Sequence, residues 1–264
     1  MKNINKHSDI IIEYYTNIYN EDARFENKGK RLEYITTMEY IHKFAKKGCK
    51  ILEIGAGTGV YSIKLAKEGY DVTAVELVES NLEIMKQNSK GINNIRCLQG
   101  DALDLFKFKD CEFDIVLNLG PMYHLYTQKD RDLAIKESLR VCKKNGICMF
   151  AYITQSSTVW YLGIKNNNMD SVEKNLNENG KLKNVPQLLF ALYDIEEFDN
   201  QFVNSNTKHL HTVATDSIAP LLSDRFDSIS DENYASFVKW HLKTCENKDL
   251  LGLSCHNLYI CKKL

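Results

Sequence analysis

Three short segments with the residue types of a nucleotide-like ligand site follow apolar stretches in the first half of the chain. Gly55-Ala56-Gly57-Thr58-Gly59 follows residues 51–54, Glu76 ends the next apolar stretch, and Asp101 follows a third. Glycines allow a sharp turn and let a ligand touch the backbone. A carboxylate in the second position can accept both ribose hydroxyls, and one in the third can reach an adenine amino group. The combination predicts a site for an adenosyl cofactor, whereas the glycines alone would indicate only a tight turn.

The details of the glycine segment favour S-adenosylmethionine (SAM) over NAD. Its spacing, G-x-G-x-G, differs from the G-x-G-x-x-G of dinucleotide-binding turns, where a pyrophosphate lies on a helix N-terminus. Glu53 precedes Gly55 by two residues. A negative charge there favours a sulfonium and an α-ammonium group and repels a pyrophosphate. A nicotinamide oxidoreductase is the alternative that this comparison disfavours.

The same segments resemble the motifs of class I SAM-dependent methyltransferases. Residues 53–59 are similar to the first motif of that family, Glu76 to the second, Asp101-Ala102 to the third and residues 113–118 to the fourth. The resemblance covers about residues 45–153. The segment 119–125, Leu-Gly-Pro-Met-Tyr-His-Leu, is similar to small-molecule enzymes related to ubiquinone and menaquinone biosynthesis.

The resemblance implies an α/β fold with a Rossmann-like, seven-stranded sheet. The implied strand order is 3-2-1-4-5-7-6, with the last strand antiparallel, helices on both faces, N-terminal helices and a helical insert. In such proteins the N-terminal segment folds over the cofactor and brings an aromatic residue and an arginine to its methionine end. Tyr14 and Arg24 are the predicted pair, with Tyr15 and Arg31 as close alternatives. The residues predicted to bind the cofactor are Tyr14, Arg24, Glu53, Gly55, Ala56, Gly57, Glu76, Leu77, Asp101, Ala102, Asn118 and Leu119.

The candidates for contact with a methyl acceptor are His124, Tyr123 and His256. Methyl transfer from a sulfonium requires alignment of the reacting atoms and exclusion of water. It requires a general base only when the acceptor is protonated at working pH. Any of these three rings could instead be packed in the core. Asn118-Leu119-Gly120-Pro121 replaces the Asn/Asp-Pro-Pro-aromatic tetrad of enzymes that methylate base amines, which argues against that substrate class.

Alternating apolar and amphipathic stretches predict β-α-β units on a parallel sheet. Two helices precede the first strand, separated by a polar break at residues 26–30. The predicted strands are 50–54, 71–76, 95–99, 113–119 and 146–153, with two later ones near 208–214 and 257–262. The predicted helices are near 58–68, 79–90, 130–144 and 231–245, the third ending at Asn145-Gly146.

We expect one SAM-methyltransferase domain over residues 1–264. Within it, residues 1–47 form an N-terminal helical cap and residues 48–154 the cofactor-binding core. Residues 155–205 form a helical insert that serves as a substrate lid, and residues 206–264 the C-terminal strands and helix. Residues 186–193 are the apolar part of that insert.

Bulk composition fits a cytoplasmic enzyme that acts on a small molecule. Lys and Arg number 34 against 35 Asp and Glu, so the basic surplus typical of nucleic-acid binding is missing. No apolar run approaches the ~18 residues of a membrane helix. The eight cysteines form no C-x-x-C pair, and no metal is expected. The predicted product is S-adenosylhomocysteine (SAH). An RNA or protein methyltransferase and a non-catalytic SAM-binding regulator are the alternatives, and the oligomeric state is open.

Overall fold

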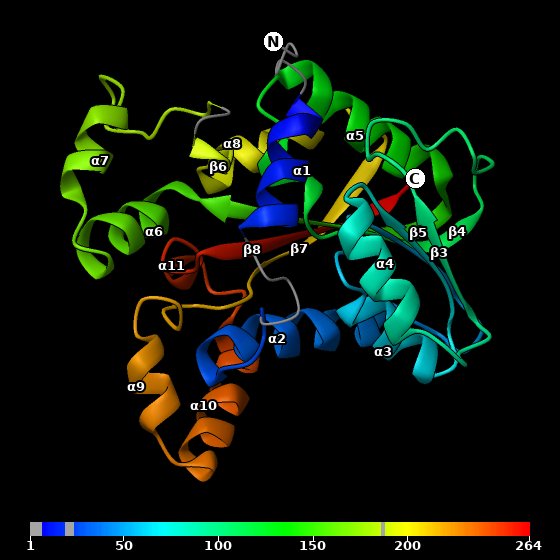
Figure 1. Cartoon of the computed structure of the whole chain (residues 1–264), viewed down its shortest axis with the longest axis horizontal. Helices are drawn as coiled ribbons and strands as arrows, with labels where there is room; N and C mark the ends of the chain where they lie inside the picture. The colour runs from blue at the N-terminus through cyan, green and yellow to red at the C-terminus, as the bar shows by residue number, and fades with distance from the viewer. Residues whose placement is uncertain (1–6, 19–23, 186–187) are drawn as a thin grey trace.

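A central sheet with helices on both faces organises the computed structural model, which describes residues 7–18, 24–185 and 188–264 (Figure 1). The strands follow the order β3-β2-β1-β4-β5-β8-β7. Their bounds are β1 Lys50–Ile54, β2 Asp71–Glu76, β3 Ile95–Gln99, β4 Phe113–Asn118, β5 Cys142–Thr154, β6 Leu192–Tyr193, β7 Thr207–Ala214 and β8 His256–Lys263. Strands β1 to β5 are parallel, and β8 runs antiparallel to both β5 and β7. This confirms the strand order and the antiparallel last strand that the resemblance implied.

The helices precede, connect and follow these strands. Their bounds are α1 His7–Asn17, α2 Lys28–Phe44, α3 Val60–Lys67, α4 Glu79–Asn88, α5 Gln128–Val141, α6 Gln155–Val159, α7 Met169–Asn175, α8 Ile195–Asp199, α9 Ser223–Ser228, α10 Asp231–Thr244 and α11 Lys248–Leu251. Short helical turns η2 Pro121–His124, η3 Trp160–Lys165 and η5 Asn200–Phe202 complete the set. No helix among the described residues has the length and apolar character needed to cross a membrane.

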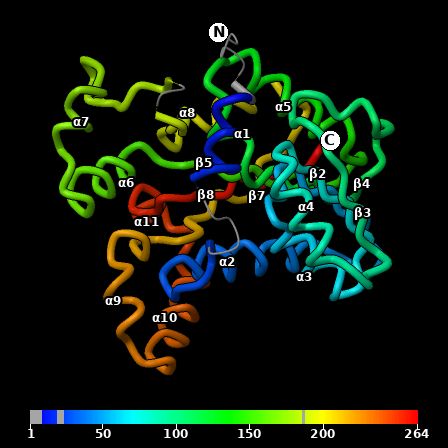
Figure 2. Tube along the Cα trace, viewed as in Figure 1, coloured from blue at the N-terminus to red at the C-terminus, as the bar shows by residue number. Residues whose placement is uncertain are grey.

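The inner strands β1, β2 and β4 are buried on both faces because each face is covered by helices. Successive residues of β1 point to opposite sides, so Ile51 packs with Ile41 of α2 and Leu65 of α3, while Leu52 packs with Ile135 of α5. Figure 1 shows α2 and α3 on one side of the sheet and α5 on the other. Helix α1 lies apart from these layers, between α4 and the segment that follows β5 (Figures 1 and 2).

The predicted end of the helix near 130–144 is wrong. Helix α5 ends at Val141, and β5 begins at the next residue because Cys142 is fully buried and pairs with Phe113 of β4. Asn145, with a left-handed φ of 64°, and Gly146 form an irregularity inside the strand. A Cβ on Gly146 would lie 2.8 Å from the Asp114 carbonyl oxygen, so this glycine permits close approach of β4 and does not end a helix.

The segment after β5 is less helical than predicted. It contains α6, η3, α7 and α8, but the apolar stretch before α8 forms the short strand β6. This strand pairs with the end of β5 through Leu192 and Ile153, which adds an eighth strand beside the predicted seven. Pro186 and Gln187 lie outside the described residues. Because a two-residue strand has no sequence period of its own, only its pairing with β5 defines it.

Helix α10 holds α2 in place through a buried histidine. The His241 ring is fully buried, and its Nε2 lies 3.1 Å from the hydroxyl oxygen of Thr36 on α2. Burial lowers the pKa of His241 from 6.5 to about 4. The folded protein therefore keeps this ring neutral at a pH where the unfolded chain protonates it.

We predict that this histidine makes the fold less stable in mild acid. Between pH 7 and pH 5 the unfolded chain binds the proton and the folded chain does not, so the free energy of unfolding falls by about 2 kcal/mol from this group. Urea unfolding of the wild type, His241→Gln and the exposed-site control His209→Gln at both pH values measures the effect. The control should lose stability as the wild type does, and His241→Gln should lose less. An equal loss in all three would show that another group is responsible.

Candidate active site

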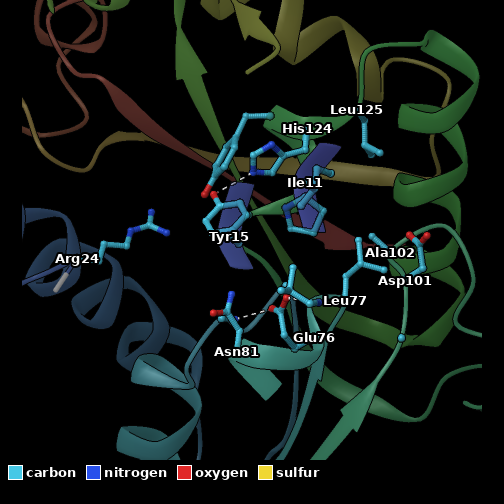
Figure 3. A pocket seen from close by; sticks show the side chains of 17 residues that line it. Ile11, Tyr15, Arg24, Glu76, Leu77, Asn81, Asp101, Ala102, His124 and Leu125 are labelled. Carbon is cyan, nitrogen blue, oxygen red and sulfur yellow. Dashed lines mark hydrogen bonds between the residues drawn. The ribbon is translucent and has the colours of Figure 1, made fainter. Parts of the chain in front are cut away.

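A pocket opens at the edge of the sheet where β1, β2, β3 and β4 end. Its walls are the turns after these four strands, together with α1 (Figure 3). The space between these walls, including its open mouth, is about 630 Å³. The lining residues are Ile11, Tyr15, Arg24, Gly55, Gly57, Glu76, Leu77, Val78, Asn81, Gly100, Asp101, Ala102, Gly120, Pro121, Tyr123, His124 and Leu125.

The turn after β1 adopts the backbone shape that its glycines allow. Gly55, Gly57 and Gly59 all have left-handed φ values, of 72°, 56° and 89°. The amides of Gly55 and Ala56 both donate to the Val75 carbonyl of β2, at 2.8 and 3.0 Å. A Cβ on Gly55 would lie 2.8 Å from the Pro121 ring, so the turns after β1 and β4 are in close contact here.

Glu76 is buried in the pocket wall and joins two of the turns. Its Oε2 accepts the Gly57 amide at 2.7 Å, and its Oε1 accepts the Val78 amide at 2.8 Å. The side chain is 5% exposed, and these hydrogen bonds compensate part of the cost of burying a charged group. Glu76 therefore presents a fixed carboxylate at the wall of the pocket.

Asp101, Ala102 and Leu77 complete the side of the pocket near β2 and β3. Asp101 Oδ1 accepts the Leu103 amide at 2.9 Å, which fixes the carboxylate in the turn after β3. Figure 3 shows Leu77 and Ala102 beside Asp101, on separate segments that face the same space. Asn81 of α4 and Val78 also line this side, and neither was predicted. Asn81 is buried, and the sequence offered no signal that separates it from other polar residues of the helix.

Helix α1 contributes Tyr15 and Ile11 to the pocket, and not the predicted Tyr14. Residues four apart share a face of a helix, whereas neighbours point about 100° apart. The Tyr15 hydroxyl lies 3.1 Å from Nε2 of His124, as the dashed line in Figure 3 shows. The Ile11–Tyr15 spacing would have favoured the alternative Tyr15 over Tyr14.

Arg24 lines the pocket on the side away from Glu76 and Asp101 (Figure 3). Its Nη2 donates to Glu33 Oε1 of α2 at 2.7 Å. Arg31, the alternative to Arg24, does not line the pocket.

His124 and Tyr123 form the wall contributed by η2, and both are buried. Nδ1 of His124 lies 3.1 Å from the Leu189 carbonyl oxygen, so this nitrogen carries a proton, because a carbonyl only accepts. In the neutral ring, Nε2 then accepts the Tyr15 hydroxyl. The Tyr123 hydroxyl donates to the Leu119 carbonyl at 3.1 Å. Both rings are thus held by contacts within the protein.

Five other predicted residues lie next to the pocket without lining it: Glu53, Ala56, Asn118, Leu119 and His256. Asn118 is fully buried, and its side-chain nitrogen donates to the Ser138 hydroxyl on α5, the helix that covers one face of the sheet. Leu119 contributes its carbonyl to the hydrogen bond with Tyr123.

Glu53 is the least expected of these, because its carboxyl group is buried beneath the glycine turn. It is 2% exposed and accepts a hydrogen bond from the Ser62 hydroxyl of α3. Burial raises its pKa to about 8, the Ser62 hydrogen bonds oppose this, and the nearby Glu76 carboxylate adds to it. The sequence argument assumed an anionic Glu53, whereas this environment favours a protonated one near pH 7.

Comparisons with known proteins agree with the fold. Residues 52–150 match the family model described as a methyltransferase domain. Over 107 residues the chain is 36% identical to a demethylmenaquinone methyltransferase of Staphylococcus carnosus, a match that covers 39% of this chain and 43% of the relative. The chain thus spans less than half the length of the curated relatives it matches.

Two solved structures share the fold over nearly the whole chain. A geranyl diphosphate C-methyltransferase of Streptomyces coelicolor has a TM-score of 0.62 at 11% identity and covers 99% of both chains. A SAM-dependent methyltransferase of Thermotoga maritima, described as a possible histamine N-methyltransferase, has a TM-score of 0.60 at 18% identity, covering 97% of this chain and 99% of that one. The match over residues 52–150 thus agrees with the resemblance of the sequence motifs, and the two solved structures share the fold.

We predict that Gly55→Ala destabilises the protein more than a matched glycine change does. Gly48 shares the left-handed φ (81° against 72°) but has nothing within 4 Å of an added Cβ. Gly48→Ala should therefore cost only the backbone strain of about 1–2 kcal/mol. Gly55→Ala should cost about 1–3 kcal/mol more, because the methyl group overlaps Pro121. Urea unfolding of both variants measures the difference, and equal losses would contradict the close packing of the two turns.

Proposed function

We propose that this protein is an enzyme that transfers a methyl group from SAM to a small-molecule acceptor and releases SAH. The placement of Glu76 carries the proposal. Its carboxylate is fixed at the end of β2 by the Gly57 and Val78 amides and lines the pocket. Two ribose hydroxyls need such a pair of oxygens.

The rest of the pocket fits the other parts of SAM. Asp101 Oδ2 accepts no hydrogen bond from the described residues, so it is available to an adenine amino group between Leu77 and Ala102. Gly55 and Gly57 leave room for the methionine part to lie against the backbone. A guanidinium has five N–H donors, so Arg24 can contact both Glu33 and the SAM carboxylate. We propose that Tyr15 takes the place predicted for Tyr14 beside the methionine end.

When bound, SAM supplies a methyl group on a sulfonium that is already activated for in-line displacement, so the proposal includes no metal. The protein's own contribution is to align the acceptor and exclude water. Tyr15 and Ile11 of α1 cover the pocket, and the hydrogen bond from Tyr15 to His124 closes α1 against η2. Leu189, from the segment after β5, is joined to the same histidine. We propose that these parts form the acceptor end of the site, with Tyr123 as a wall residue.

A small acceptor suits this arrangement better than a nucleic acid. The net charge of −1 gives little of the phosphate attraction on which nucleic-acid binding depends. The relatives named as demethylmenaquinone methyltransferases act on a small molecule, which agrees with the proposal.

We predict that SAM binds and that Glu76→Gln weakens this binding by about 1–3 kcal/mol, the cost of losing charged hydrogen bonds, or about 5- to 150-fold in Kd. Isothermal titration calorimetry with SAM measures the effect. Glu79→Gln, an exposed carboxylate on the first turn of α4, is the matched control and should bind as the wild type does. No binding to the wild type at millimolar SAM would contradict the proposed function. An unchanged Kd for Glu76→Gln would contradict only the role of that residue.

We further predict that SAM binding releases about one proton from Glu53 at pH 7. The pKa of about 8 leaves this carboxyl group mostly protonated in the free protein, and a nearby cation lowers the pKa. Calorimetry at pH 7 in two buffers with different ionisation enthalpies measures the release, and affinity should rise from pH 6.5 to 8.5. Glu53→Gln should release no proton and bind with a flatter pH profile. The same release from both proteins would assign the proton to another group.

A further inference from the structure

A carboxylate–histidine pair lies at the same edge of the sheet as the pocket. His256 is the first residue of β8, and its Nδ1 lies 2.7 Å from Oδ2 of Asp216. Asp216 is 1% exposed, and its Oδ1 accepts the Ser254 hydroxyl at 2.6 Å and the His256 amide at 3.1 Å. The two hydrogen bonds to Oδ1 thus fix the carboxylate whose other oxygen contacts the imidazole ring. Because an ionised carboxylate only accepts, the proton between the two groups is on Nδ1.

This tautomer leaves the lone pair of the neutral ring on Nε2. No hydrogen bond from the described residues engages that nitrogen, and the side chain is 25% exposed. His124 differs, because its Nε2 is already in contact with the Tyr15 hydroxyl. Of the two predicted histidines, His256 is therefore the one with a nitrogen free to accept a proton from a ligand.

His256 lies beside Tyr123, which lines the pocket, and beside Glu33, which is paired with the lining residue Arg24. Its ring centroid is 6.2 Å from that of Tyr123. Its Nδ1 is 3.9 Å from Oε2 of Glu33, whose other oxygen accepts from Arg24. On the sheet, His256 pairs with Ile153, at the carboxyl end of β5, the strand next to β4. The pair is therefore adjacent to the pocket on the side of Tyr123 and Arg24, away from Asp101.

The charges around the ring favour proton uptake. Burial acts to lower the pKa of His256, but the carboxylates of Glu33 and Asp216 outweigh it and raise the pKa above the ordinary value. Arg24 opposes them more weakly. An imidazolium formed here is therefore stabilised by two carboxylates, one of which already orients the ring.

The same three side chains, Glu33, Asp216 and His256, could be considered as cation ligands, since their donor atoms all lie within 4.8 Å of one another. The hydrogen bonds argue against this. Nδ1 and Oδ2 are at hydrogen-bond distance, and Glu33 is already paired with the guanidinium of Arg24 at 2.7 Å. The geometry is that of a hydrogen bond from Nδ1 of His256 to the Asp216 carboxylate.

We propose that His256, positioned by Asp216, accepts a proton from the methyl acceptor, and that the acceptor is therefore a proton-bearing oxygen, nitrogen or sulfur such as a phenol, an ammonium group or a thiol. The inference rests on the proposed function. The bond between the acceptor atom and the methyl carbon forms while the carbon–sulfur bond breaks, and its electron pair goes to sulfur. The acceptor proton moves to Nε2 before this bond forms, which gives an ammonium nitrogen the lone pair it needs, and the imidazolium then carries the charge that the sulfonium loses.

The positioning role of Asp216 is tested by ¹⁵N-histidine NMR on the free and the SAH-saturated protein between pH 5 and 9. The resonances absent from His256→Gln identify the ring. We expect the neutral ring to carry its proton on Nδ1 and its pKa to fall by about one unit in Asp216→Asn. Asp224→Asn, an exposed carboxylate on α9, is the control and should leave the resonances unchanged. A proton on Nε2, or the same pKa in Asp216→Asn as in the wild type, would overturn the proposal.

The acceptor class is tested with labelled SAM and three probes, phenol, methylamine and 2-mercaptoethanol. We expect transfer to at least one of them. His256→Gln should lower kcat by about 100-fold with an unchanged Kd for SAM, and Asp216→Asn should lower kcat and shift the pH profile more than KM. Transfer at the wild-type rate by His256→Gln, or none to any probe while SAM binds, would overturn this inference. Failure to bind SAM would instead contradict the proposed function.

Discussion

The hydrogen bonds of one buried carboxylate hold the pocket together. Glu76, at the end of β2, accepts an amide from the glycine turn after β1 and another from the entry to α4. The Val75 carbonyl before it accepts the Gly55 and Ala56 amides. The turn after β1 is thus tied to the end of β2 on both sides, and Pro121 packs against it from β4. Without Glu76, two amides would lose their acceptor and the turn its fixed position beside the pocket.

The electrostatics of this edge follow from how many acids are buried there. Glu33, Glu53, Glu76 and Asp216 are the buried acids of the described residues, and all four lie near the ends of the parallel strands. Burying four carboxylates in one region is costly unless each finds compensation. Glu33 accepts a hydrogen bond from Arg24, Asp216 from His256, and Glu76 from two backbone amides. The raised pKa of Glu53 favours its neutral form, which is less costly to bury. A region with this surplus of acids favours a cationic ligand over an anionic one.

The sequence predicted the strands and residues that depend on local pattern. It did not predict the features that depend on contacts between residues far apart in the chain. The apolar strands and the acids at their ends follow from alternation and spacing, so Glu76 and Asp101 could be placed before the fold was known. Asn145-Gly146 is typical of a helix end, but here the two residues form an irregularity inside β5. Only their contact with β4 reveals this. Asp216 carries no sequence signal as a partner of His256, because 40 residues separate them.

The direction of β8 explains how that distant pair reaches the pocket. Parallel strands bring only their carboxyl ends to this edge, so the residues they contribute are those that follow a strand. β8 runs antiparallel to β5 and β7, and its first residue, His256, therefore lies at the edge where β5 ends. The same edge receives Asp216 just after the carboxyl end of β7, two residues beyond Ala214, which pairs with Asn257. An antiparallel strand between two parallel ones thus joins a histidine to a carboxylate beside a pocket that the parallel strands build.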